Sequence, residues 1–72
     1  MSKQKLFSAA EVIKILSNND FELISQKGSH QKWKNFNSGC QVIIPFHKGK
    51  QLPIGTLKSI IEGSGLDSEI WK

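Results

Sequence analysis

The stretch FELISQKGSHQKWKNF, residues 21–36, decides the fold. At its centre, Gly28-Ser29 matches a two-residue hairpin turn, with Gly supplying the positive φ that a type II′ turn needs. Before the turn, FELIS alternates, so Phe21, Leu23 and Ser25 are expected on one face of a strand. After the turn, His30 to Phe36 forms a mostly polar second strand. The stretch therefore predicts an antiparallel hairpin with a histidine at the head of its second strand.

A helix is expected before the hairpin, and a strand and a second helix after it. Ser8-Ala9-Ala10-Glu11 has the form of a capping box and precedes an apolar stripe, which predicts a helix at about residues 8–18. Asn37-Ser38-Gly39 indicates a second tight turn, and Cys40 to Pro45 the third and most apolar strand. Pro53 opens the second helix, Gly63 or Gly65 closes it, and Asp67 caps a last short turn.

The expected fold is therefore α+β, in the order helix, three antiparallel strands, helix. Two helices on one face of a three-stranded meander form a compact two-layer domain. Residues 1–72 are expected to be one domain, because 72 residues do not provide two cores. A domain of this size does not enclose a large cofactor, so we expect no cofactor. The active site would be a shallow surface feature, which favours a polymer as substrate.

The composition restricts the partner and the cellular location. The net charge is +4, from ten Lys, no Arg and six acids, which indicates a polyanionic partner or, equally, ordinary solubility. The single cysteine, Cys40, gives no disulfide framework and, with two histidines, no convincing metal site; we expect it to be a buried strand residue. No signal peptide or membrane span is recognisable, so a cytoplasmic protein is expected.

The strand after the first turn places a histidine among lysines. Alternation predicts His30, Lys32 and Lys34 on one face and Trp33 in the core on the other. Neighbouring positive charge favours neutral imidazole, the form that acts as a general base, and lysines hold a phosphate. With the 2′-hydroxyl of RNA as the nucleophile, these groups suffice for a metal-free ribonuclease. The alternative is an exposed hairpin histidine without a task, and the pattern alone leaves both readings open.

A basic loop, Phe46 to Gln51, joins the third strand to the second helix. Within it His47, Lys48 and Lys50 are candidate phosphate contacts, to which the following helix N-terminus adds a favourable dipole. The alternative is a solvated loop, and the spacing alone favours that alternative.

Five segments of the chain, in this order, carry a resemblance to a known family: Ile13-Lys14-Ile15-Leu16 with Phe21-Glu22-Leu23-Ile24, then Gln26-Lys27-Gly28-Ser29-His30, then Val42-Ile43-Ile44-Pro45 with His47-Lys48-Gly49-Lys50, then Gly55-Thr56-Leu57-Lys58-Ser59-Ile60, and Gly65-Leu66. With them the chain resembles the HicA toxin family (YcfA-like), the small mRNA interferases of type II toxin–antitoxin pairs.

The resemblance implies a fold like that of double-stranded-RNA-binding domains, α-β-β-β-α, and an endoribonuclease whose catalytic histidine is the one after Gly-Ser, His30. It implies mRNA as substrate and a HicB-type antitoxin as the partner that covers the site. Lys58 stands where members often carry Arg, which predicts a looser grip on phosphate. The turn is set by Gly28, and the candidate RNA contacts are Lys27, Ser29, Lys32, Lys34, His47, Lys48 and Lys50.

Two other functions are possible for this sequence. One is a double-stranded RNA-binding module without chemistry, which reads shape and phosphates. Such modules usually carry a lysine cluster where their second helix starts, whereas this helix holds only Lys58. The other is an interaction domain that binds an antitoxin without activity, with Ile70 and Trp71 as partner contacts. Packing of Trp71 against the first helix is the competing role.

Overall fold

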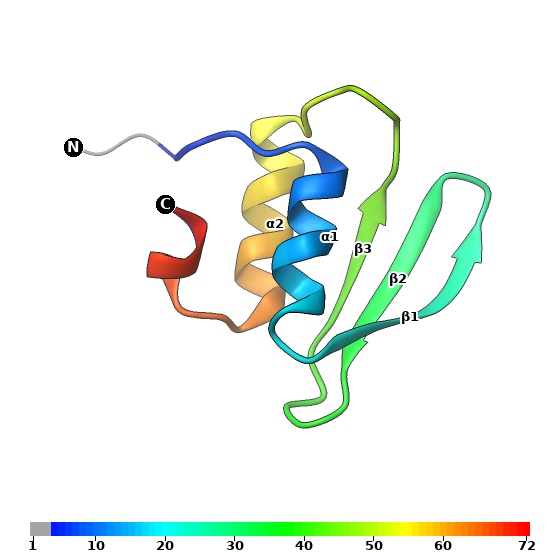
Figure 1. The fold of residues 1–72 in the computed structure, drawn as a ribbon, viewed down its shortest axis with the longest axis vertical. Coiled ribbons are helices and arrows are strands. Elements are labelled where there is room, and N and C mark those ends of the chain that lie inside the picture. Colours follow the sequence, from blue (N-terminus) through cyan, green and yellow to red (C-terminus); the bar gives the residue numbers. More distant parts are fainter. Residues whose placement is uncertain (1–3) are drawn as a thin grey trace.

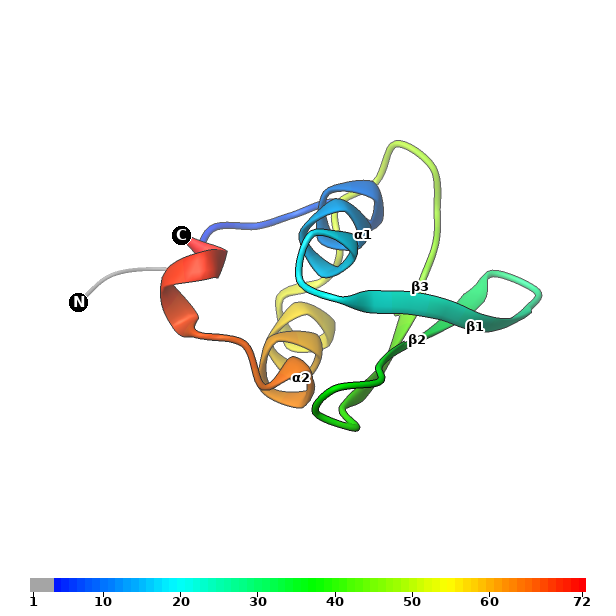
Figure 2. The same cartoon turned by 60° about the horizontal axis from the view of Figure 1, so that its bottom comes forward.

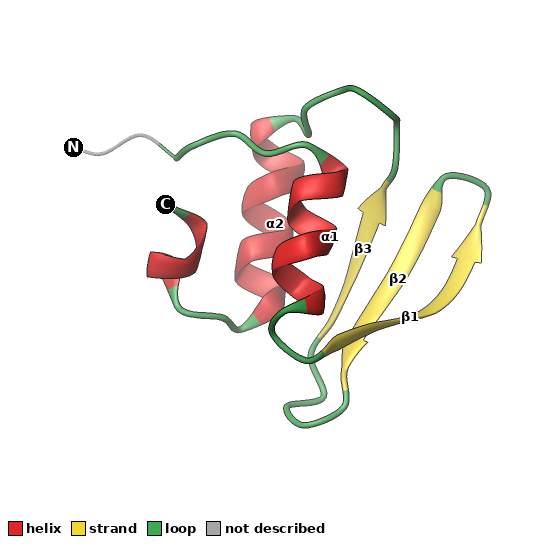
Figure 3. Cartoon of the chain, in the orientation of Figure 1, coloured by secondary structure: helices red, strands yellow, loops and turns green. Residues whose placement is uncertain are grey.

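The computed structural model describes residues 4–72 and confirms the expected order of elements (Figure 1). The first three residues of the expected 1–72 domain lie outside the described part. The elements, coloured by type in Figure 3, are α1 (Ala9–Ser17), β1 (Phe21–Lys27), β2 (His30–Asn35), β3 (Gln41–Pro45), α2 (Ile54–Ser64) and a short 3₁₀ helix, η1 (Ser68–Trp71).

The molecule has two layers. The strands form an antiparallel sheet in the order β1-β2-β3, so β2 is the central strand. Both α-helices lie side by side on the same side of this sheet (Figures 1 and 2), with α1 next to β1 and α2 next to β3. Within the described residues no helix covers the other side of the sheet, which therefore faces solvent.

The start of α1 has the predicted capping box. The Ser8 hydroxyl accepts a hydrogen bond from the Glu11 N–H at 3.2 Å, and the Glu11 carboxylate accepts one from the Ser8 N–H at 2.8 Å. The backbone N–H of Ser8, and after it the Ser8 hydroxyl, lower the pKa of Glu11 because they stabilise its charged carboxylate. The helix buries Val12 and Leu16 completely, so the capped end fixes which of its faces meets the sheet.

The C-terminal segment folds back onto the core. Gly65 ends α2 in the left-handed conformation (φ 67°), as predicted, and the Asp67 side chain accepts from the Glu69 N–H at 2.9 Å to cap η1. Trp71 is only 1% exposed and meets the Phe7 ring edge-on, with ring centroids 6.0 Å apart. The partner-contact interpretation of Trp71 is therefore wrong, because its side chain is part of the core.

One strand prediction is also wrong. Leu23 lies opposite Trp33, but Ser25 lies opposite Lys32, so Ile24 is an extra residue in a β-bulge. The bulge moves Ser25 to the side of the sheet opposite Leu23, the side that carries Lys32. The side chains of β1 alternate strictly between the two faces of the sheet only from Phe21 to Leu23.

The turn between β2 and β3 depends on Asn35, which sequence analysis placed in the strand without a special role. This side chain is 8% exposed, and its amide donates to the Asn19 carbonyl at 3.2 Å. Its Oδ1 accepts from the N–H groups of Asn37 and Ser38 at 2.8 and 3.1 Å. Asn35 thereby ends β2 one residue before Phe36, and Cys40 becomes a half-buried residue that precedes β3.

Asn35→Ala is expected to lower the free energy of unfolding by about 2–3 kcal/mol, because it removes three hydrogen bonds worth about 1 kcal/mol each. Urea denaturation followed by circular dichroism measures the change. The matched control is Asn37→Ala in the same turn, where the side chain is exposed and a change within about 0.5 kcal/mol is expected. Equal losses in the two variants would contradict the role of Asn35.

Candidate functional site

His30 is the first residue of the central strand and is held from both sides. Gly28 has a φ of 60°, and the two-residue turn pairs Lys27 with His30. On the other side Pro45 of β3 lies opposite His30, and the Phe46 N–H donates to the Ser29 carbonyl at 2.7 Å. The backbone that carries the imidazole is therefore fixed by two neighbouring strands and a tight turn.

The direction of the His30 side chain follows from the core residues of the same strand. Trp33 is buried on the helix side, and its indole N–H donates to the Gln31 Oε1 at 3.0 Å. Because side chains alternate, His30, Lys32 and Lys34 point to the solvent side, as predicted. We call this side the open face; the register adds to it Glu22, Ser25 and Lys27 of β1 and Gln41, Ile43 and Pro45 of β3.

A shallow hollow of about 430 Å³ lies on the open face beside His30. We call it the His30 hollow. Lys32 lies opposite Ser25 on one neighbouring strand and Ile43 on the other, and directly opposed residues have Cβ atoms about 5 Å apart. Three strands thus contribute to one site, which is lined by Ser25, Lys27, His30, Lys32 and Ile43.

The other predicted site residues lie outside this hollow. Lys34 is further along the open face, where its ammonium lies 5.2 Å from the centroid of the Phe36 ring. The loop after β3 leaves the sheet at the end where His30 lies, since Pro45 is paired with His30. Its basic side chains are exposed and do not line the hollow: His47, Lys48 and Lys50.

The lysines of the open face are available to an anion. Across residues 4–72, the one ion pair within 4 Å is Lys72 with Glu69, at 3.1 Å. The ammonium groups of Lys27, Lys32 and Lys34 therefore have no carboxylate partner at that distance. In the same part of the chain, no three His, Cys, Asp or Glu side chains are grouped to hold a metal ion. The polar groups that line the hollow with His30 are the ammonium groups of Lys27 and Lys32 and the hydroxyl of Ser25.

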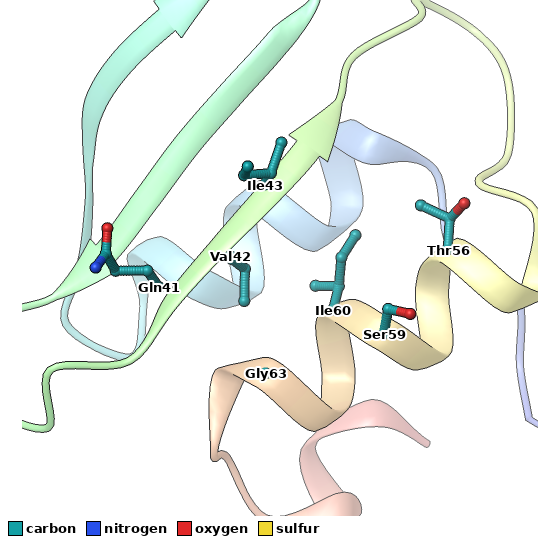
Figure 4. A pocket seen from close by; sticks show the side chains of 7 residues that line it. All are labelled: Gln41, Val42, Ile43, Thr56, Ser59, Ile60 and Gly63. Atoms are coloured by element: carbon teal, nitrogen blue, oxygen red, sulfur yellow. The ribbon is translucent and has the colours of Figure 1, made fainter.

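A second hollow, of about 390 Å³, lies between β3 and α2 (Figure 4). Val42 and Ile60 face each other across it, and Thr56 and Ser59 line it from α2. None of its lining side chains ionises, so it offers no general base or cation. The His30 hollow is accordingly the better site for chemistry.

Two lining residues of the His30 hollow were missed by sequence analysis. Ser25 was predicted on the wrong side because the bulge at Ile24 was not foreseen. Ile43 was predicted only as part of the apolar third strand, yet it is 53% exposed on the open face. The alternation of β3 around the buried Val42 and Ile44 was the available signal for Ile43.

A comparison with models of known protein families identifies the family of this chain. A family model described as HicA toxin of bacterial toxin-antitoxin matches residues 9–66, a range that runs from α1 through α2 and contains the whole His30 hollow. No curated protein matches the chain. None of the helices within residues 4–72 is long and apolar enough to cross a membrane. The chain belongs to the HicA toxin family of bacterial toxin–antitoxin systems.

Proposed function

We propose that this chain is an endoribonuclease, the mRNA interferase of a type II toxin–antitoxin pair, with residues 1–72 as its single toxin domain. The observation that supports it most is the exposed imidazole of His30 in a hollow that also holds Lys27 and Lys32, in a member of a toxin family. The reaction needs no cofactor.

In the proposed reaction, the substrate supplies the nucleophile. The His30 imidazole takes the proton of a ribose 2′-hydroxyl, and the 2′-oxygen attacks the adjacent phosphorus. The bond from phosphorus to the 5′-oxygen breaks, and that oxygen receives a proton from the imidazolium. The products are a 2′,3′-cyclic phosphate and a 5′-hydroxyl. A positioned base of this kind contributes about 10²- to 10⁴-fold to the rate.

The surrounding cations would hold the phosphate and stabilise its charge in the transition state. Lys27 is paired with His30 across the turn, and Lys32 is two residues further along the same face. The hollow is at the low end of the range of ligand pockets, about 300–1,000 Å³, so it suits one unit of a longer chain. The remaining proposed RNA contacts flank it: Ser29, Lys34, His47, Lys48 and Lys50.

Lys32→Gln is expected to weaken the binding of single-stranded RNA and to reduce its salt dependence. Each phosphate contact contributes a slope of about 0.7 in a plot of log K against log salt concentration, so the variant should lose about that much. Fluorescence anisotropy at several salt concentrations measures the slope. Lys14→Gln, an exposed lysine of α1 in the helix layer, is the control and should leave the slope unchanged. Equal effects of both substitutions would mean that only net charge matters.

The partner of the toxin is proposed to be a HicB-type antitoxin that covers the open face and excludes RNA from His30. Charge complementarity supports this arrangement, because the open face carries three lysines without carboxylate partners in the described part of the chain. We propose that the toxin acts in the cytoplasm, because the proposed substrate is mRNA.

Expression in a bacterial host without the antitoxin tests the proposed function. The parent chain is expected to arrest growth and to degrade mRNA, and His30→Ala is expected to do neither at an equal protein level. If His30→Ala arrests growth and degrades mRNA as well as the parent, catalysis by His30 is wrong. If the parent does neither, the chain is not an active interferase.

A further inference from the structure

Phe36 is the most exposed large apolar side chain among residues 4–72, with 62% of its surface accessible. It directly follows β2, and the Lys34 ammonium lies 5.2 Å from its ring centroid. Since Lys34 belongs to the open face, this contact places the ring at the same face. Single exposed apolar residues are common on protein surfaces, so exposure alone assigns Phe36 no role. Its position relative to the other open-face groups is what distinguishes it.

The side chains of β2 on the open face form a row, with an imidazole at one end and an aromatic ring at the other. His30 is the first residue of the strand, Lys32 and Lys34 follow at alternate positions, and Phe36 comes directly after the strand ends. Six residues of strand span about 20 Å at about 3.3 Å per residue. The row therefore runs from a proton acceptor past two cations to a flat apolar ring, over a length that several nucleotides of an extended strand cover.

The order of these side chains suits a single-stranded nucleic acid, which has a charged backbone and bases with free faces. Proteins that bind single strands combine a cationic groove for the backbone with aromatic side chains on which bases stack, and a cation beside the ring adds to the attraction. Lys32 and Lys34 would follow the backbone, and the Phe36 ring offers its face to a base. No other aromatic side chain lies on the open face within the described residues, since Trp33 and Phe21 are buried and Phe46 follows β3 half-buried.

We propose that Phe36 is a base-stacking subsite for the RNA strand, a few nucleotides from the scissile phosphate beside His30. The inference rests on the proposed function, because it takes the RNA to lie along the open face. It adds a requirement on the substrate: the nucleotide at Phe36 is unpaired, because a base within a duplex has no free face. The subsite thus selects single-stranded segments over duplexes.

Binding of uncleaved RNA tests the subsite, with His30→Ala as the background so that the substrate survives. The probe is a single-stranded RNA of about 12 nucleotides, within the site sizes of small single-strand-binding folds, and a blunt duplex of the same sequence. Adding Phe36→Ala is expected to weaken single-strand binding roughly 5- to 150-fold, the effect of one lost stacked base. Phe36→Trp should keep the affinity. Leu6→Ala, a 40% exposed residue before α1, is the matched control and should not change it.

Two further readouts separate stacking from a general loss of binding. The Phe36→Ala variant should keep the salt slope of the background protein, because no phosphate contact is lost. A 2-aminopurine placed at successive positions of the RNA should change its fluorescence on binding at one position, and this change should disappear with Phe36→Ala. Duplex binding should be the same with and without the ring. Thermal melting of the variants verifies that each one folds.

The outcomes distinguish the subsite from the proposed function. If the His30→Ala protein binds RNA and Phe36→Ala leaves that binding unchanged, the subsite is wrong and the proposed function stands. An equal loss for duplex and single strand would also overturn the subsite. If the His30→Ala protein binds no RNA and the parent cuts none, both fail together.

Discussion

His30→Ala is expected to reduce kcat for RNA cleavage by about 100- to 10,000-fold, the contribution of one positioned general base. The imidazole is exposed, and the hollow that it lines also contains Lys27 and Lys32. In this proposal it is the one group near the scissile phosphate that accepts a proton at neutral pH. The alanine variant keeps the lysines, so RNA binding should change little and the loss should appear in kcat rather than in KM.

Single-turnover cleavage of a labelled RNA measures this effect, and circular dichroism verifies that the variant folds. His47→Ala is the informative comparison, because His47 is exposed in the loop after β3 and does not line the hollow. For His47→Ala we expect a change in KM. A fall in kcat as large as that of His30→Ala would place the base in the loop and contradict the assignment.

Trp71→Ala is expected to lower the free energy of unfolding by about 3–5 kcal/mol, the typical cost of truncating a buried aromatic side chain. Trp71 is the largest of the side chains that are almost completely buried. A chain of 72 residues has a stability of about 4–11 kcal/mol at about 0.05–0.15 kcal/mol per residue. The substitution therefore removes a large part of the total free energy of unfolding. An appreciable fraction of the protein should then be unfolded at 37 °C.

Urea denaturation compares this variant with Trp71→Phe. The phenylalanine keeps an aromatic ring beside Phe7 and removes the indole N–H, which has no hydrogen-bond partner among residues 4–72. It should therefore lose clearly less stability than the alanine variant. A loss below about 0.5 kcal/mol for Trp71→Ala is typical of a surface residue and would contradict its place in the core.

The local features of the fold were predictable because their signals are local. The capping box of α1 uses two side chains three residues apart, and both bonds form as predicted. Gly28 and Gly65 have the positive φ that their positions at a turn and at a helix end require. Asp67 caps η1 as expected. Each of these features depends on neighbours within a few residues, so the sequence shows all of its parts at once.

The features that depend on distant segments were not predictable in the same way. A β-bulge adds a residue to one strand relative to its partner, and nothing in FELISQK marks Ile24 as that residue. Asn35 acquires its importance from the Asn19 carbonyl, sixteen residues away. Cys40 falls just outside β3 because the Asn35-centred turn takes up the residues before it.

The candidate site likewise has a part that the local sequence predicts and a part that depends on distant segments. Alternation around Trp33 was enough to place His30, Lys32 and Lys34 on one face, because a strand alternates whatever it packs against. The members from other strands, Ser25 and Ile43, required the register of the sheet. The basic side chains of the loop after β3 do not line the hollow, which was not predictable because the sequence does not fix the direction of the eight residues between β3 and α2.

The chemistry of the RNA ends after cleavage is the most direct test of the central claim, that the His30 imidazole activates a ribose hydroxyl. Purified protein is incubated with a defined single-stranded RNA in the presence of excess chelator, and the products are identified by mass spectrometry. We predict cleavage that leaves 2′,3′-cyclic phosphate and 5′-hydroxyl ends and that is lost with His30→Ala. Products with 3′-hydroxyl and 5′-phosphate ends would show that water is the nucleophile and contradict the claim.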